Sequence, residues 1–65
     1  MNRLKERRKE LGLTQKQVAE RAGLSWQVYQ RYELGARTPI ATTAIKVARA
    51  LETTVEALYS VVEDE

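Results

Sequence analysis

Side chains able to make directional polar contacts gather in one short segment, from Trp26 to Arg31. Gln27 and Gln30 each carry a donor beside an acceptor, and the Arg31 guanidinium carries a fork of donors, so these groups can form paired hydrogen bonds. The chain contains no His and no Cys, which removes the commonest general base, the thiol nucleophile and the usual nitrogen and sulfur metal ligands. We therefore expect recognition rather than catalysis, with no enzyme activity, no cofactor and no metal.

Charge is divided unevenly along the chain. Residues 1–37 hold nine basic and four acidic side chains, a net charge of +5, whereas residues 38–65 hold two basic and five acidic, a net charge of −3. A basic front half and an acidic tail indicate one side that faces a polyanion. On charge alone, a solvated surface that keeps a small protein in solution explains the distribution equally well.

The chain length sets limits on organisation. Its 65 residues are enough for one small domain over 1–65, near the lower limit for a core that supports itself. No signal peptide and no apolar run of membrane-spanning length occurs, and the absence of Cys fits a reducing compartment. We expect a cytoplasmic protein with no membrane partner.

Apolar residues recur at three-to-four spacing and no stretch alternates as a half-buried strand would, so the sequence predicts an all-α fold. We expect five helices, over residues 2–11, 15–22, 26–33, 40–51 and 55–62. Their apolar faces predict a shared core. The expected core residues are Leu4, Leu11, Leu13, Val18, Ala19, Ala22, Leu24, Tyr29, Tyr32, Ala41, Ala44, Ile45, Ala48, Leu51, Val55, Leu58 and Val62.

The expected helix ends carry recognisable signals. Thr14 followed three residues later by Gln17 forms a capping box, in which each side chain satisfies an amide of the helix start. Other start and stop signals follow the same chemistry of caps and left-handed glycines. They are Ser25, Thr54, the pair Thr38–Pro39, Gly23 and Gly35.

The stretches "GLTQ", "AG" and "YELG" between residues 12 and 35, with "RTP" after them, carry a family resemblance. Gln15, Ala19 and Gly23 stand at typical positions, and the segment resembles the λ-repressor-like helix-turn-helix of the Xre or Cro type. "AIKVARALETTVEALY" is similar to the family's last two helices, so the resemblance covers nearly the whole chain. It implies a compact five-helix DNA-binding domain with the helix-turn-helix at helices two and three. The chain departs from the usual pattern at Arg7, Trp26, Tyr29 and Glu52.

In such a motif the second helix enters the major groove of DNA. With both tyrosines turned inward, the resemblance implies that the base-reading residues are Trp26, Gln27, Val28, Gln30 and Arg31. Gln27 matches the edge of adenine and Arg31 that of guanine, while Trp26 and Val28 can contact a thymine methyl group. A second arrangement stays open, in which the Trp26 ring folds back over the preceding helix.

The resemblance also assigns residues around this helix. Gln15, Ser25 and Arg37 would hold DNA phosphates; Gln15 is also placed to brace Gln27, and Ser25 can equally serve as a plain helix cap. Arg8 and Glu33 would form an ion pair that orients the recognition helix.

A single recognition helix reads only a few base pairs, and relatives bind palindromic sites as two-fold dimers. The expected homodimer interface comprises Tyr59, Val61, Val62 and Leu58, although Leu58 can equally close the core of one chain.

These observations predict sequence-specific binding of double-stranded DNA by a transcriptional regulator, with repression favoured over activation. An antitoxin or a restriction–modification controller would be a variant of the same role. An alternative from another class is a helix-turn-helix adaptor that binds protein, with Trp26 as its anchor.

Overall fold

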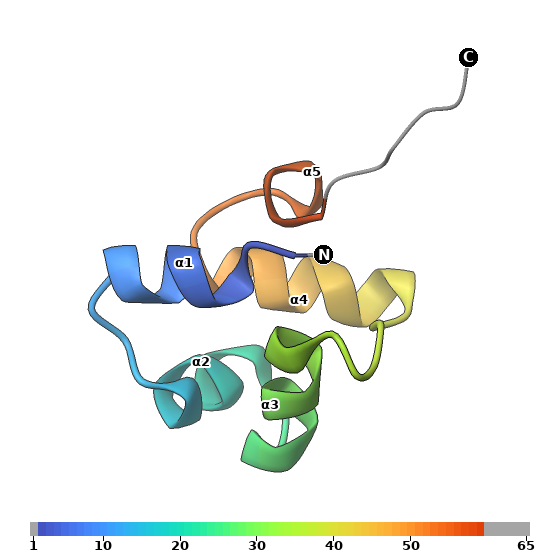
Figure 1. Cartoon of the computed structure of the whole chain (residues 1–65), viewed down its shortest axis with the longest axis horizontal. Helices are drawn as coiled ribbons and strands as arrows, with labels where there is room; N and C mark the ends of the chain where they lie inside the picture. The colour runs from blue at the N-terminus through green and yellow to red at the C-terminus, as the bar shows by residue number, and fades with distance from the viewer. Residues whose placement is uncertain (1, 60–65) are drawn as a thin grey trace.

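The computed structural model describes residues 2–59. These residues form five α-helices, which confirms the predicted all-α architecture. The helices are α1 (Leu4–Glu10), α2 (Gln15–Ala22), α3 (Trp26–Leu34), α4 (Ala41–Ala50) and α5 (Val55–Leu58). Figure 1 shows α2 and α3 on one side of α4 and the short α5 on the other. None of the helices within residues 2–59 has the length and apolar character needed to cross a membrane.

Side-chain caps begin three of the helices, as the sequence predicts. Thr14 Oγ1 accepts a hydrogen bond from the Gln17 amide at 3.1 Å, and Gln17 Oε1 accepts one from the Thr14 amide at 2.8 Å. Ser25 Oγ accepts from the Val28 amide at 3.3 Å and Thr54 Oγ1 from the Ala57 amide at 3.2 Å, so these side chains cap α3 and α5. These caps fix where α2, α3 and α5 begin.

The ends of α2 and α3 follow the prediction, but the start of α4 does not. Gly23 and Gly35 take φ values of 71° and 75° and close α2 and α3 in the left-handed region, which glycine adopts without steric cost. The capping signal expected at Thr38–Pro39 is wrong, because α4 begins after Ile40, whose ψ of 163° keeps the chain extended. The expected range of 40–51 starts one residue too early. Pro39 is buried just before this point.

The predicted fifth helix, 55–62, is wrong at its end. It stops at Leu58, and Tyr59 takes an extended conformation with φ −121° and ψ 120°. Asn2 and Tyr59 form an antiparallel bridge, and the Arg3 amide donates to the Leu58 carbonyl at 2.8 Å. Pairing with the start of the chain thus replaces the next helical turn. Residues 60–62 lie outside the described part.

The buried core agrees with most of the predicted positions. Its members are Leu4, Val18, Ala19, Ala22, Tyr29, Tyr32, Ala44, Val47, Ala48, Ala50, Leu51 and Leu58. The predicted residues Leu11, Leu13, Leu24 and Val55 are partly buried and pack against this cluster. Val62, also predicted, lies outside the described residues.

The predicted inward face of α4 needs a correction. Ala41 is exposed and Ile45 is 45% exposed, whereas Val47 is fully buried and Ala50 is 6% exposed. Helix α4 packs against both α2 and α5, so its buried stripe is turned toward Val47. Ile45 falls outside that stripe.

Candidate nucleic-acid interface

Helix α3 buries one face and exposes the other. Tyr29 and Tyr32 are 0% and 5% exposed, and their burial fixes the rotation of the helix about its axis. Gln27 and Arg31 are exposed and Gln30 is half-buried. The polar groups of the predicted base-reading set therefore share the outward side of the helix.

The Trp26 ring lies against the start of α2. Its Nε1 donates a hydrogen bond to Gln15 Oε1 at 3.2 Å, and the Lys16 ammonium lies 4.8 Å from the ring centroid. This is the folded-back arrangement that the sequence left open, although the residue stays 38% exposed. Val28 is half-buried and packs against the core, so only part of its apolar surface is accessible.

Gln15 connects α2 to both ends of α3. Its Nε2 donates to Glu33 Oε1 at 3.1 Å, while its Oε1 accepts from Trp26. Gln15 therefore braces Trp26, where the sequence predicted a brace on Gln27. The amide nitrogen carries two hydrogens, so within the described contacts one of them is left for an acceptor outside the chain.

The structure brings Arg8 of α1 and Glu33 of α3 together as an ion pair. Arg8 Nε lies 2.6 Å from Glu33 Oε2 and Arg8 Nη2 lies 3.2 Å from Glu33 Oε1. Arg8 Nη1 also donates to the Leu13 carbonyl at 3.0 Å. The side chains are 13% and 3% exposed, so this two-point contact fastens the end of α3 to α1 in a site largely without water.

Burial and hydrogen bonding act in opposite directions on this pair. Burial by itself raises the pKa of Glu33, but hydrogen bonds from Arg8 and Gln15 outweigh it and hold the pKa below its ordinary value. The hydrogen bond to Glu33 raises the pKa of Arg8. Burial is the main cause that raises the pKa of Tyr29, and the neighbouring Glu33 carboxylate raises it further. The carboxylate is thus held ionised and the Tyr29 phenol neutral.

The other predicted phosphate-binding residues are accessible. Ser25 Oγ accepts the α3 capping hydrogen bond, which leaves its hydroxyl hydrogen able to donate outward. Arg37 is exposed just beyond α3, and Arg31 is exposed in its last turn. Among residues 2–59 neither arginine takes part in an ion pair. Both can therefore offer a free positive charge to a polyanion.

Of the predicted dimer residues, the structure describes Leu58 and Tyr59, at the end of α5, a helix that lies on the other side of α4 from α2 and α3 (Figure 1). Leu58 is 1% exposed and belongs to the core of its own chain. Tyr59 is half-buried. Val61 and Val62 lie outside the described residues.

The sequence did not predict two residues that make contacts with α3, Lys16 and Asn2. Lys16 stands beside the α2 cap, where its charge is visible in the sequence, but its contact with the Trp26 ring forms only in the tertiary structure. Asn2 donates to the Tyr32 carbonyl at 2.8 Å and accepts from the Leu4 amide at 3.1 Å. It ties the last turn of α3 to the start of α1 across thirty positions, for which no local signal exists.

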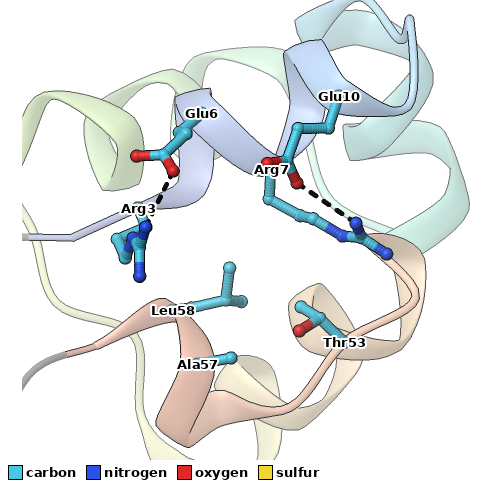
Figure 2. A pocket seen from close by; sticks show the side chains of 7 residues that line it. All are labelled: Arg3, Glu6, Arg7, Glu10, Thr53, Ala57 and Leu58. Atoms are coloured by element: carbon cyan, nitrogen blue, oxygen red, sulfur yellow. Dashed lines mark hydrogen bonds and ion pairs between the residues drawn. The ribbon is translucent and has the colours of Figure 1, made fainter.

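A separate pocket lies between α1 and the α4–α5 region, as Figure 2 shows. Its lining residues are Arg3, Glu6, Arg7, Glu10, Thr53, Ala57 and Leu58. Arg3 pairs with Glu6 at 2.8 Å and Arg7 with Glu10 at 3.2 Å. The four charged side chains of the lining thus pair with one another.

Comparison with known proteins shows which family the sequence of this chain matches. The helix-turn-helix family HTH_3 matches residues 4–58. An HTH-type transcriptional regulator of Methanothermobacter thermautotrophicus is 46% identical over 48 residues, 74% of this chain and 70% of the relative.

Two further relatives are longer. The cryptic phage CTXphi transcriptional repressor RstR of Vibrio cholerae is 38% identical over 56 residues, 86% of this chain and 50% of RstR. The HTH-type transcriptional regulator YqaE of Bacillus subtilis is 36% identical over 55 residues, 85% of this chain and 47% of YqaE. The matched region thus spans about half of each of these two proteins. With α2 and α3 as its two-helix motif, this chain belongs to the helix-turn-helix family, a helical DNA-binding fold and not an enzyme family.

Proposed function

We propose that this protein binds double-stranded DNA in a sequence-specific manner and regulates transcription, with α3 in the major groove. The observation that carries the proposal is the division of α3 into a buried face with Tyr29 and Tyr32 and an outward face with Gln27, Gln30 and Arg31. An amide pairs with adenine and a guanidinium with guanine through two hydrogen bonds each. The face therefore carries groups that can distinguish base pairs.

Rigid attachment of α3 supports the same function. Arg8 holds Glu33 from α1, Gln15 reaches both Glu33 and Trp26 from α2, and Asn2 holds the Tyr32 carbonyl. Discrimination between bases needs side chains held in a defined position. Trp26, which stays 38% exposed, and the accessible part of Val28 add apolar surface that can contact a thymine methyl group.

Phosphate contacts would set the register of the protein on the duplex. Gln15, Ser25 and Arg37 each keep a donor available near one end of α2 or α3. Contacts of this kind position a protein without reading sequence. Base contacts from α3 then supply the specificity.

Repression and dimeric binding are the finer parts of the proposal. A protein that occupies its site can block transcription, and the name of the relative RstR describes a transcriptional repressor. One helix reads too few base pairs to define a genomic site, so we expect two copies on a palindrome. Tyr59, with Val61 and Val62 beyond the described residues, would lie in the contact between the copies.

Selection of bound duplexes from a random pool tests the proposal. The expected result is a defined motif with two inverted half-sites about one helical turn apart. Affinity for that motif is expected to fall linearly on logarithmic axes as salt rises. Recovery of random sequence only, or binding that ignores salt, would contradict it.

A further inference from the structure

Lys16 lies beside the recognition helix and is held there by an aromatic ring. It is the second residue of α2 and is exposed to solvent. Its Nζ lies 4.8 Å from the centroid of the Trp26 ring, a position in which the face of an indole attracts a cation. The ammonium group therefore has a preferred place next to the first turn of α3.

The ring that holds Lys16 is itself fastened to the body of the protein. Trp26 Nε1 donates to Gln15, Gln15 donates to Glu33, and Glu33 is paired with Arg8. An indole has a single polar hydrogen, and Gln15 already accepts it. The Trp26 ring is thus left to present apolar surface and to position Lys16.

Lys16 has no acidic partner among residues 2–59. The ion pairs in that part of the chain join Arg3 to Glu6, Arg7 to Glu10, Arg8 to Glu33 and Arg21 to Glu52. An unpaired ammonium beside a helix that enters the major groove lies near the phosphates that border the groove. Because the ring already restricts the lysine side chain, a phosphate contact costs less conformational entropy.

We propose that Lys16 contacts a DNA phosphate and that Trp26 is the positioning residue that holds it for this contact. The inference rests on the proposed function, since it concerns the same interface. It gives α2 a charged contact in addition to the neutral amide of Gln15.

The test measures affinity for the selected duplex over a range of salt concentrations. Lys16→Gln removes the charge, Lys16→Arg keeps it, and Lys46→Gln removes a matched charge elsewhere. Lys46 lies with the C-terminal end of α2, remote from Lys16. We expect the log–log salt slope to fall by about one in Lys16→Gln. The slope should stay unchanged in the other two variants, with the same base preference in all.

A second measurement isolates the role of the ring. If Trp26 positions Lys16, the loss of affinity caused by Lys16→Gln becomes smaller in a Trp26→Leu background, so the two changes do not add. Trp26 is the single tryptophan of the chain. Its fluorescence in the free protein is therefore expected to change in Lys16→Gln and to be restored in Lys16→Arg.

Each outcome decides a separate point. If the wild type binds its duplex and Lys16→Gln keeps the full salt slope, the phosphate contact is refuted while the proposed function stands. If the slope falls but the two substitutions add, Trp26 does not position Lys16. If the wild type binds no duplex, the proposed function is overturned, and this inference with it.

Discussion

Arg8 Nε and Glu33 Oε2 lie 2.6 Å apart in a contact that joins α1 to the end of α3. The Glu33 side chain is 3% exposed, so its charge has lost nearly all of its water. Desolvation offsets much of the attraction in such a pair. The contact therefore serves mainly to hold α3 in one orientation.

Removal of one partner is expected to cost more than removal of both. Glu33→Gln leaves the Arg8 guanidinium without its counter-charge, and breaking a buried pair in this way costs about 3–5 kcal/mol. The double variant Arg8→Met/Glu33→Met replaces the pair with apolar side chains and should retain most of the stability. Urea unfolding measures all three. Equal losses in the single and double variants would contradict the pairing, and Glu6→Gln in the exposed Arg3–Glu6 pair is the matched control.

The same pair predicts the response to acid. The pKa of Glu33 in the folded protein is below its ordinary value of 4.5, so ionised Glu33 favours folding above that pH. The contribution is lost as the pH falls from about 4.5 through the lower folded pKa. Unfolding free energies measured by urea between pH 7 and pH 2 should therefore decrease at the acid end. The Arg8→Met/Glu33→Met variant lacks this part of the decrease.

Local signals in the sequence predicted the parts of the fold that local chemistry decides. Thr14, Ser25 and Thr54 cap the expected helices because a cap needs only residues within one turn. The inward face of α4 was predicted less well. Ile45 was expected in the core, but the packing of α4 against α2 and α5 buries Val47 and leaves Ile45 exposed. The rotation of α4 is set by packing between helices.

In the candidate site, too, local features were predictable from the sequence and contacts between elements were not. The outward side of α3 follows from the burial of Tyr29 and Tyr32, which helical spacing predicts. The contacts of Asn2 with Tyr32 and of Lys16 with Trp26 join different elements, and no spacing rule encodes them. The sequence therefore indicates which side of α3 faces outward, but not which contacts hold the two ends of that helix in place.

The two arginines in Figure 2 are expected to differ in their contribution to stability. Arg7 Nε donates to the Leu51 carbonyl at 2.9 Å and Arg7 Nη2 to the Glu52 carbonyl at 3.0 Å, so Arg7 caps the end of α4. We expect Arg7→Ala to cost about 1.5–3 kcal/mol, the range for hydrogen bonds to a charged group. Arg3→Ala breaks a pair whose side chains are 60% and 58% exposed and should cost less than about 1 kcal/mol.

Thermal or urea unfolding of both variants checks this difference. Arg7→Lys is a further control, since an ammonium group cannot reproduce the planar fork that reaches two carbonyls. It should rescue only part of the loss. Equal stability of the Arg7→Ala and Arg3→Ala variants would contradict the capping role.

Glu52 is a site where stability can be gained. It has a φ of 56°, the only positive φ at a non-glycine residue within the described part, in a region that costs an L-residue about 1–2 kcal/mol. Its carboxylate pairs with Arg21 at 3.3 Å, with both side chains well exposed. Glu52→Ala removes that weak pair and keeps the strain, whereas Glu52→Gly removes both. We expect Glu52→Gly to be about 1 kcal/mol more stable than Glu52→Ala, as measured by urea unfolding.

Two substitutions are expected to affect base reading and phosphate binding separately. Gln27→Ala removes an outward amide of α3, so we expect the preference at one base-pair position to weaken by about 1–3 kcal/mol. Arg37→Ala removes an exposed, unpaired charge beyond α3, so we expect the salt slope to fall by about one while base preference is retained. Competition among single-base variants of the selected duplex measures the first effect, and a salt titration measures the second.

The same pair of experiments also decides between a DNA-reading face and a protein-binding one. Gln27, Arg31 and Arg37 would all be dispensable for duplex binding if α3 served a protein partner. Trp26 would then be the expected anchor, because it is a large aromatic side chain that stays 38% exposed. On a face that reads DNA, different side chains carry the two properties. Amides discriminate between bases, and cations make the affinity depend on salt. If Gln27→Ala loses base preference but keeps the salt slope of the wild type, the result favours a face that reads DNA. A face that binds protein is not expected to place base preference and salt dependence on different side chains.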